Sequence, residues 1–491
     1  MADANQFSRA DVSADLSTPD DVGGTDRDPR HEAAAGGPPP RSRFRRRRIA
    51  GALLRSLIAV LVGSLMLRLA SHAMGQMTQF YLDHISSRYY HISYTTRGYV
   101  IASFFVTELL GSLVLGAMSD RYGRKIFIML GPLLGAIAVQ MTAMTSVLWV
   151  LVFARLLAGL STGSSVPATL GYISEATVGR PTLRARVVGL FEITLVGGFA
   201  IGSFVAGYLW TFFGSPRTIV GFELLSPAFS ILGLIFLMAL AVFAWGFSDR
   251  KRRAHSNSNT PSHSATARKK LAHYYRVFKS PSVRMFSPAW ISIFSIVGVW
   301  TNHSVGLFTG KVRLQEQLLM GNISPEKFGN GSALLLALFA GGVLAWSFVL
   351  ARYRKTNVML ASTFALFALL LTVLCLNHLG PSNSIHYLLL GAFLFEILVL
   401  SGFTPAALTY LADVTENYAA DRGSIMGLYS VFLGVGQLVG TSLGGYFADW
   451  NGVDGLLLLS AIFGGITALS LLTLRRHEAA ATRLSSVVTE E

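Results

Sequence analysis

Charged side chains and cysteine are scarce in this sequence, and each shortage excludes a class of protein. Only 14% of the 491 residues are charged, whereas soluble globular chains have about 25%, and the mean hydropathy is +0.50. A chain of this composition cannot cover its surface with groups that water solvates. Cys375 is the single cysteine, so no disulfide framework, iron–sulfur site or cysteine-based zinc site can form within one chain.

Motifs for enzymatic chemistry are missing as well. The sequence has no G-x-x-x-x-G-K-[ST] phosphate-binding loop, no nucleophile motif, and no cluster of histidine and acidic residues at metal-ligand spacing. We therefore expect no enzyme activity and no cofactor or metal, and any transport must draw on a gradient. The net charge of +15 is typical of loops that keep Lys and Arg on one side of a membrane, so we expect no nucleic-acid partner.

Long apolar segments recur along the chain, and about 20 such residues span a bilayer. The polar residues 1–48 end in an arginine run and predict a disordered cytoplasmic tail. A basic linker at 248–283 separates residues 49–247 from residues 284–476, and 477–491 form a second cytoplasmic tail. The sequence predicts an all-α membrane protein with 12 transmembrane helices in two six-helix bundles. The predicted spans are 53–82, 98–118, 126–146, 148–172, 187–210, 226–247, 286–308, 330–351, 357–377, 386–411, 426–448 and 454–474.

Lysine and arginine are concentrated in alternate loops. With the N-terminus inside, the loops on the inner side contain Arg121, Arg124, Lys125 and the whole basic linker, while the opposite side has few cations. The positive-inside rule therefore predicts a multi-pass protein of the cell membrane with both termini in the cytoplasm.

The two groups of six spans are related by an internal repeat. Sliding the chain along itself by 238 residues superimposes residues 188–210 on 426–448 with no gap, and it places Glu175 on Asp413. This spacing predicts two similar, pseudo-symmetric halves related by an axis along the membrane normal. Because such halves can close on each other, we expect a monomer. The superimposed glycine pairs are Gly189 and Gly427, Gly198 and Gly436, Gly202 and Gly440, Gly207 and Gly445, and Gly214 and Gly452.

The most specific motif is GAMSDRYGRK, residues 116–125, in the loop after the second span. It matches G-x-x-x-D-R-x-G-R-[RK], the signature loop of the major facilitator superfamily, and the chain resembles this family over roughly residues 50–476. The resemblance implies a cytoplasmic gate that latches the halves in one of two alternating states. Charges that only set the topology are the alternative. The gate candidates are Gly116, Asp120, Arg121, Gly123, Arg124, Lys125, Glu175, Arg184, Asp413 and Arg422.

Ionisable side chains inside the spans indicate a solute or proton pathway, because each costs about 2.5 to 3.5 kcal/mol at a helix centre. Four polar residues at helical spacing, beginning with Arg68, share one face of the first span and predict the lining of a water-filled cavity. Glu108 is our preferred partner for Arg68, and a permanent structural ion pair is the alternative. The substrate and proton-coupling candidates are Arg68, His72, Gln76, Gln79, Glu108, Arg155, Glu192, Asn302, His303 and Glu396.

Arg155 begins an R-x-x-x-G-x-x-x-G segment that is similar to one in many facilitators. The resemblance implies a role in coupling for this arginine, as in the proton-coupled members. Two subfamily patterns are incomplete: Ser203 replaces the proline of the antiporter motif, and the P-E-S-P-R element of sugar porters is absent. The resemblance and the buried charges together predict a transporter that moves a small organic solute by alternating access, coupled to protons. A facilitated-diffusion uniporter and a transporter-like receptor or scaffold without flux are the alternatives.

Overall fold

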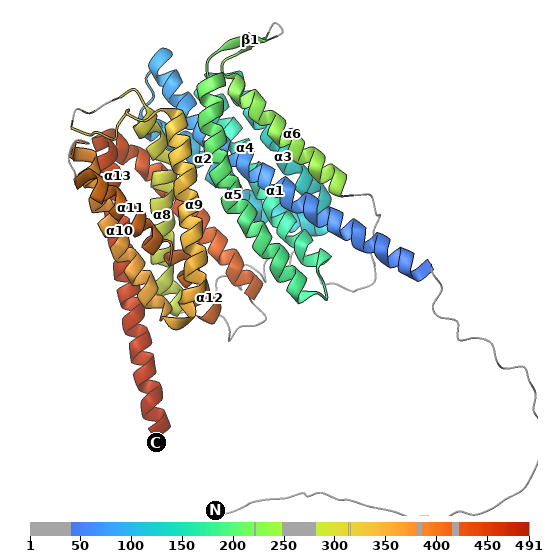
Figure 1. The fold of residues 1–491 in the computed structure, drawn as a ribbon, viewed down its shortest axis with the longest axis vertical. Helices are drawn as coiled ribbons and strands as arrows, with labels where there is room; N and C mark the ends of the chain where they lie inside the picture. Colours follow the sequence, from blue (N-terminus) through green and yellow to red (C-terminus); the bar gives the residue numbers. More distant parts are fainter. Residues whose placement is uncertain are drawn as a thin grey trace, which may run out of the picture. The chain divides into compact units, whose positions relative to one another are not determined.

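The computed structural model describes the backbone of residues 41–219, 222–247, 281–312, 314, 316–380, 385–414 and 422–490. Nearly all of it is helical (Figure 1). The helices are α1 (Arg41–Arg88), α2 (Tyr94–Tyr122), α3 (Arg124–Ala143), α4 (Leu148–Ala176), α5 (Pro181–Phe213), α6 (Pro227–Gly246), α8 (Pro281–Thr309), α9 (Pro325–Val349), η1 (Leu350–Arg352), α10 (Lys355–His378), α11 (Ile385–Leu400), α12 (Phe403–Val414) and α13 (Arg422–Glu490). Strands β1 (Arg217–Ile219) and β2 (Phe222–Leu224) form an antiparallel hairpin.

The structure describes a part of each predicted tail, and that part is helical. Helix α1 begins at Arg41, inside the range that we expected to be disordered, and α13 continues through Glu490. Arginine and the small and aliphatic residues that follow it are good helix formers, and no proline interrupts either stretch, so both stretches are helical. Residues 1–40 and 248–280, which include most of the predicted tail and linker, lie outside the described residues.

Eleven segments of the described chain are long and apolar enough to cross a membrane. The last of them, Val431–Ala479, is 49 residues long, about twice what a crossing needs. Its helix is interrupted at Asn451 and Gly452, whose backbone angles are not helical. Gly452 has φ +58°, a conformation that glycine adopts without steric cost and that here reverses the chain.

The packing of α13 on α8 demonstrates this reversal. Before the turn, successive residues of α13 contact residues of increasing number in α8. After the turn, they contact residues of decreasing number. In order along α13, the contacts are Gly436 with Ile291, Gly440 with Ser295, Gly444 with His303, Ser460 with Trp300, and Ser470 with Met285. Helix α13 therefore consists of two helices that run in opposite directions along α8.

The tenth predicted span is interrupted between Leu400 and Phe403, where α11 ends and α12 begins. Side chains of neighbouring helices bind carbonyl groups in the last turn of α11. The indole Nε1 of Trp346 donates to the Leu398 carbonyl at 2.9 Å, and the Ser362 hydroxyl donates to the Val399 carbonyl at 3.0 Å. These bonds keep polar backbone groups satisfied at membrane depth, which makes the break tolerable.

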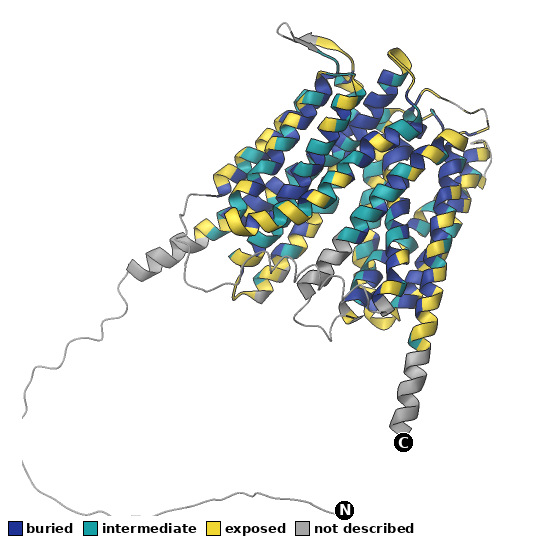
Figure 2. Ribbon diagram, turned by 180° about the vertical axis from the view of Figure 1, so that it is seen from behind, coloured by how far each residue is buried: buried dark blue, intermediate teal, exposed yellow. Residues whose placement is uncertain are grey.

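Buried residues form separate hydrophobic cores in the two halves of the chain. One core is built almost wholly by α8 to α13, and two others are built mainly by α1 to α6. Figure 2 shows exposed residues along the outer sides of the helices. Several are large and apolar: Trp149 and Phe348 are 82% and 84% exposed. A lipid bilayer accommodates such faces, whereas water does not.

The repeat predicted from the glycine spacing reappears in the packing. Gly198 of α5 lies against the α1 backbone near Leu65, and its counterpart Gly436 of α13 lies against the α8 backbone at Ile291. Helices α1 and α8 are the first crossings of their halves. The two halves are therefore built alike, as small residues at equivalent positions let equivalent helices approach.

The two ends of the bundle differ in how the halves meet. We call the end with residues 89–93, the β1–β2 hairpin and residues 310–324 the hairpin end, and the opposite end with the signature loop the motif end (upper and lower in Figure 1). Helix α2 packs on α13 and α5 packs on α9. Hydrogen bonds between the halves, among the described residues, lie towards the hairpin end: Gln79 to Asn302, Tyr94 and Thr95 to Asp449, Lys311 to Ser87, and Asn330 to Tyr208.

Candidate functional site

Four charged side chains of the N-terminal half interact with one another inside the bundle, and we call them the charge group: Arg68, Glu108, Arg155 and Glu192. Each comes from a different helix, α1, α2, α4 and α5 respectively. Glu108 interacts with both arginines, and Glu192 interacts with Arg68. Two positive and two negative groups balance in a region where charges act on each other strongly.

Arg68 and Glu108, which the sequence suggested as a pair, are neighbours but not in direct contact. Within the described chain, no nitrogen–oxygen distance of 4.0 Å or less joins them. A loose pair of this kind can rearrange without first breaking a strong ion pair.

Arg155 is enclosed by the N-terminal half and is only 3% exposed. Its guanidinium lies over the Phe104 ring, 4.8 Å from the centroid, an arrangement that stabilises a cation. Its Nε and Nη1 atoms have no hydrogen-bond partner among the described residues. Arg155 is therefore a buried charge whose main compensation comes from Phe104 and Glu108.

Two glycines of α4 lie against the backbone of α2 on either side of Glu108. A Cβ at Gly159 would collide with the backbone of α2 at Phe104, and one at Gly163 would come within 2.9 Å of the Glu108 carbonyl oxygen. The R-x-x-x-G-x-x-x-G spacing seen in the sequence thus lets α4 and α2 approach until their backbones touch.

The polar face of α1 turns towards α5 and α8. His72 Nε2 and Gln76 Nε2 both lie 3.0 Å from the Ser203 hydroxyl, and Gln79 donates to the Asn302 carbonyl. Gln76 and Gln79 are 6% and 2% exposed. In this conformation partners on α5 and α8 cover these two glutamines, and the lining of a cavity by this face stays a prediction.

Asn302 and His303 hold α8 against α13 instead of facing an open cavity. The Asn302 amide donates to the Thr441 hydroxyl at 2.9 Å, and His303 Nε2 lies 2.7 Å from the Thr441 carbonyl oxygen. Glu396 accepts a hydrogen bond of 3.0 Å from the Thr372 hydroxyl of α10. No interaction between described residues brings Glu396 to Arg68 or Arg155, the partners suggested from the sequence.

The signature loop and the end of α4 form a connected ion network at the motif end. Arg124 Nη2 lies 2.7 Å from Asp120 Oδ1, and Arg124 Nε lies 2.7 Å from Glu175 Oε1. A Cβ at Gly171 would overlap the Arg124 guanidinium, so the absence of a side chain there makes room for it. Gly123 turns the chain with φ +99°, which explains the glycine between α2 and α3.

The remaining gate candidates have separate surroundings. Gly116 lets Pro167 of α4 approach closely, with 3.2 Å to a built Cβ. Arg184 donates to the Ser174 carbonyl at 2.9 Å, so it links the start of α5 to the end of α4 across the loop between them. The Arg121 guanidinium lies 5.2 Å from the Tyr122 ring centroid, and Lys125 lies in the first turn of α3.

The second half has its own ion pair at the position that the repeat predicts. Lys355 Nζ lies 3.1 Å from Asp413 Oδ2, and Asp413 is the repeat counterpart of Glu175. The Asp and Gly of the signature loop have no counterpart there, so this pair is a simpler version of the first network. The Arg422 side chain lies outside the described residues.

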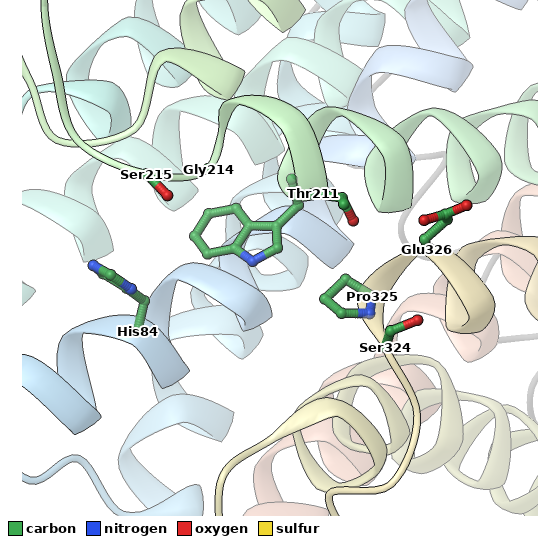
Figure 3. Close-up of a pocket in the computed structure, with 8 residues that line it drawn as sticks. His84, Thr211, Gly214, Ser215, Ser324, Pro325 and Glu326 are labelled. Atoms are coloured by element: carbon green, nitrogen blue, oxygen red, sulfur yellow. The ribbon is translucent and has the colours of Figure 1, made fainter.

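Sequence reasoning missed three features of the hairpin end. A pocket of about 280 Å³ lies between α1, the end of α5 and the start of α9, and His84, Trp210 and Pro325 are among the residues that line it (Figure 3). Asp83 and Arg97 form a buried ion pair of 3.1 Å. Asp449 binds the start of α2. The pocket residues come from three distant stretches without a motif. The Asp83 and Arg97 charges, which directly flank the predicted spans 53–82 and 98–118, were an available signal.

Two repeated six-helix bundles, joined at one end and carrying compensated charges at membrane depth, define a polytopic membrane transporter. The sequence profile of the Major Facilitator Superfamily matches residues 49–312 and 314–488. The chain belongs to this superfamily.

Individual relatives agree with this assignment. Multidrug resistance protein 2 of Bacillus subtilis (strain 168) is 24% identical over 378 residues, which are 74% of this chain and 82% of that protein. The arabinose-proton symporter of the same organism is 29% identical over 116 residues, 24% and 25% of the two chains. The crystal structure of the nucleoside transporter NupG matches with a TM-score of 0.63 at 14% identity, covering 87% of this chain and 98% of that one. It has the same fold.

Proposed function

We propose that this transporter moves a small organic solute across the cell membrane by alternating access and couples this movement to protons. The observation that carries the proposal is the unequal contact between the halves. Described hydrogen bonds join them towards the hairpin end, and the charge group lies farther along the same helices. A protein that alternates between two closures has one end shut while its central groups are reached from the other.

The distribution of Lys and Arg supports a cytoplasmic motif end and cytoplasmic termini. In that orientation the described hydrogen bonds between the halves lie towards the outer side, as they would in a state that is closed outside. The opposite state requires the halves to rock about the solute site, which parallel repeats allow.

The balance of the charge group supports proton coupling. A proton taken up by Glu108 or Glu192 leaves an arginine without its compensating charge inside the membrane, which is costly. That arginine is then stabilised by a solute with a negative or hydrogen-bond-accepting group, or by a conformation in which water reaches it. Either response links proton binding to solute movement.

The motif-end network supports a reversible gate. Its ion pairs are partly exposed, with side-chain exposures of 18% for Arg124 and 51% for Asp120. Exposed pairs contribute only about 0 to 1 kcal/mol each. Several weak pairs around Arg124 can hold one state and still separate when the halves rock.

The proposal is tested in proteoliposomes containing the purified chain, with a pH-sensitive dye inside and a panel of small solutes added outside. We expect a solute-dependent pH change in the wild type that is lost in Glu108→Gln and kept in Glu326→Gln, a charge change outside the membrane core. Solute flux without any pH change would establish a uniporter. Binding without flux would establish a receptor or scaffold, and either result would overturn the proposal.

A further inference from the structure

The start of α2 is held by a carboxylate from the other half of the chain. Asp449 of α13 accepts hydrogen bonds from the backbone N–H groups of Tyr94 and Thr95, at 2.6 and 2.7 Å, and from the Thr95 hydroxyl at 2.6 Å. The first N–H groups of a helix have no partner within the helix. The local cap Ser93 supplies an acceptor only for Thr96, so Asp449 completes the capping across the seam between the halves.

We propose that Asp449 is the latch that keeps the hairpin end closed, and that it must release α2 each time this end opens. The inference rests on the alternating access proposed above and adds the residue that controls its outer closure. Hydrogen bonds to a carboxylate are about twice as strong as neutral ones, and the positive end of the helix dipole adds to the attraction.

The internal repeat provides a comparison within the molecule. Gly445 of α13 lies against the Tyr94 carbonyl of α2, and its counterpart Gly207 of α5 lies against the Pro325 carbonyl of α9. The two seams are therefore packed alike. At the position equivalent to Asp449, however, α5 has Thr211, whose hydroxyl donates to a carbonyl of its own helix.

The α5–α9 seam is correspondingly weaker in hydrogen bonds. The start of α9 is capped by its own Ser324. The cross-seam hydrogen bond described there joins the Asn330 amide to the Tyr208 hydroxyl at 3.4 Å. Among the described residues of the two seams, a charged group caps a helix across the α2–α13 seam and not across the α5–α9 seam. We therefore assign the latch to the α2–α13 seam.

A buried ion pair stiffens the part of α2 that Asp449 holds. Arg97, in the first turn of α2, donates to Asp83 of α1 at 3.1 Å and to the Ile92 carbonyl at 3.3 Å. Its guanidinium lies 4.7 Å from the Tyr94 ring centroid. Because Arg97 ties the start of α2 to α1, the two helices should move together when Asp449 releases Tyr94 and Thr95.

The test measures opening of the hairpin end directly in the full-length chain in lipid nanodiscs. Cys375 is replaced by Ser, and spin labels are placed at His91 and Asn322, which are exposed and belong to opposite halves. Electron–electron distance distributions are compared for the labelled parent, Asp449→Asn and Glu326→Gln. The Glu326 change removes the same charge from the first turn of α9, where no described hydrogen bond crosses the seam.

We expect Asp449→Asn to raise the ratio of long to short label distances about tenfold, because a neutral amide accepts weaker hydrogen bonds than a carboxylate does. Glu326→Gln should leave this ratio unchanged. Asp449→Glu, which keeps the charge, should stay closer to the parent. An unchanged ratio in Asp449→Asn, with the parent transporting solute in the same lipids, would overturn the latch alone. Short distances in every variant together with no flux of any solute would instead overturn alternating access.

Discussion

Removing Asp83 should destabilise the protein far more than removing Asp120, although each carboxylate pairs with one arginine. The Asp83–Arg97 pair is buried, with side-chain exposures of 12% and 2%, whereas Asp120 is 51% exposed. In Asp83→Ala, Arg97 keeps its hydrogen bond to the Ile92 carbonyl and its contact with Tyr94, but it loses the only carboxylate among its described partners. A buried charge without a counter-ion is strongly unfavourable.

The expected losses follow from these exposures. Breaking a buried pair by deleting one partner costs about 3 to 5 kcal/mol, and the two remaining contacts of Arg97 place Asp83→Ala at the lower end, about 3 kcal/mol. Asp120→Ala should cost less than about 1 kcal/mol, as is usual for exposed pairs. Replacing both partners, as in Asp83→Ala with Arg97→Met, should cost less than Asp83→Ala alone because no charge is then stranded.

The assay is equilibrium unfolding in mixed micelles for the four variants Asp83→Ala, Arg97→Met, their double mutant and Asp120→Ala. The double-mutant cycle separates the interaction between Asp83 and Arg97 from the loss of each side chain. A cost below about 1 kcal/mol for Asp83→Ala, or equal costs for Asp83→Ala and Asp120→Ala, would refute the reasoning that burial decides the strength of these pairs.

Three further predictions test the packing and the gate. Gly171→Val should displace the Arg124 guanidinium, so solute flux slows several-fold while thermal stability changes little; unchanged flux would remove Arg124 from the gate. Ser203→Ala should cost about 1 to 2 kcal/mol in unfolding free energy because His72 and Gln76 share its hydroxyl, and a neutral result would show that water replaces it. Gly198→Leu and Gly436→Leu should destabilise to a similar degree in the same unfolding assay, since a Cβ at either meets atoms 2.6 Å away; strongly unequal losses would contradict the equivalence of the halves.

Hydropathy and glycine spacing predicted most of the fold. Hydropathy indicates which segments form membrane-spanning helices, and glycine spacing indicates where two helices pack closely. The spans agree with the helices, and the repeat glycines pack equivalently on α1 and α8. The break between α11 and α12 was not predicted. Its carbonyl acceptors are satisfied by Trp346 and Ser362, which lie in other helices, so the local sequence holds no signal for it.

The site was predictable only where its residues are local or repeated. The association of the signature loop with Glu175 follows from positions in two neighbouring loops, and the structure brings Arg124, Asp120 and Glu175 together. The partner of His72 and Gln76 on the polar face of α1 was not predictable, because Ser203 lies 131 and 127 residues away from them in the chain. Asp449 was missed for the same reason, because the helix start that it caps lies 355 residues away in the chain.

The most direct test of the central claim is solute accumulation driven by an imposed pH gradient in proteoliposomes, with a labelled solute found by the dye panel. We predict that the solute concentrates on one side beyond its equilibrium level, that a protonophore abolishes the excess, and that Glu108→Gln only equilibrates the solute. Equilibration without accumulation in the wild type, whatever the pH gradient, would contradict proton-coupled transport.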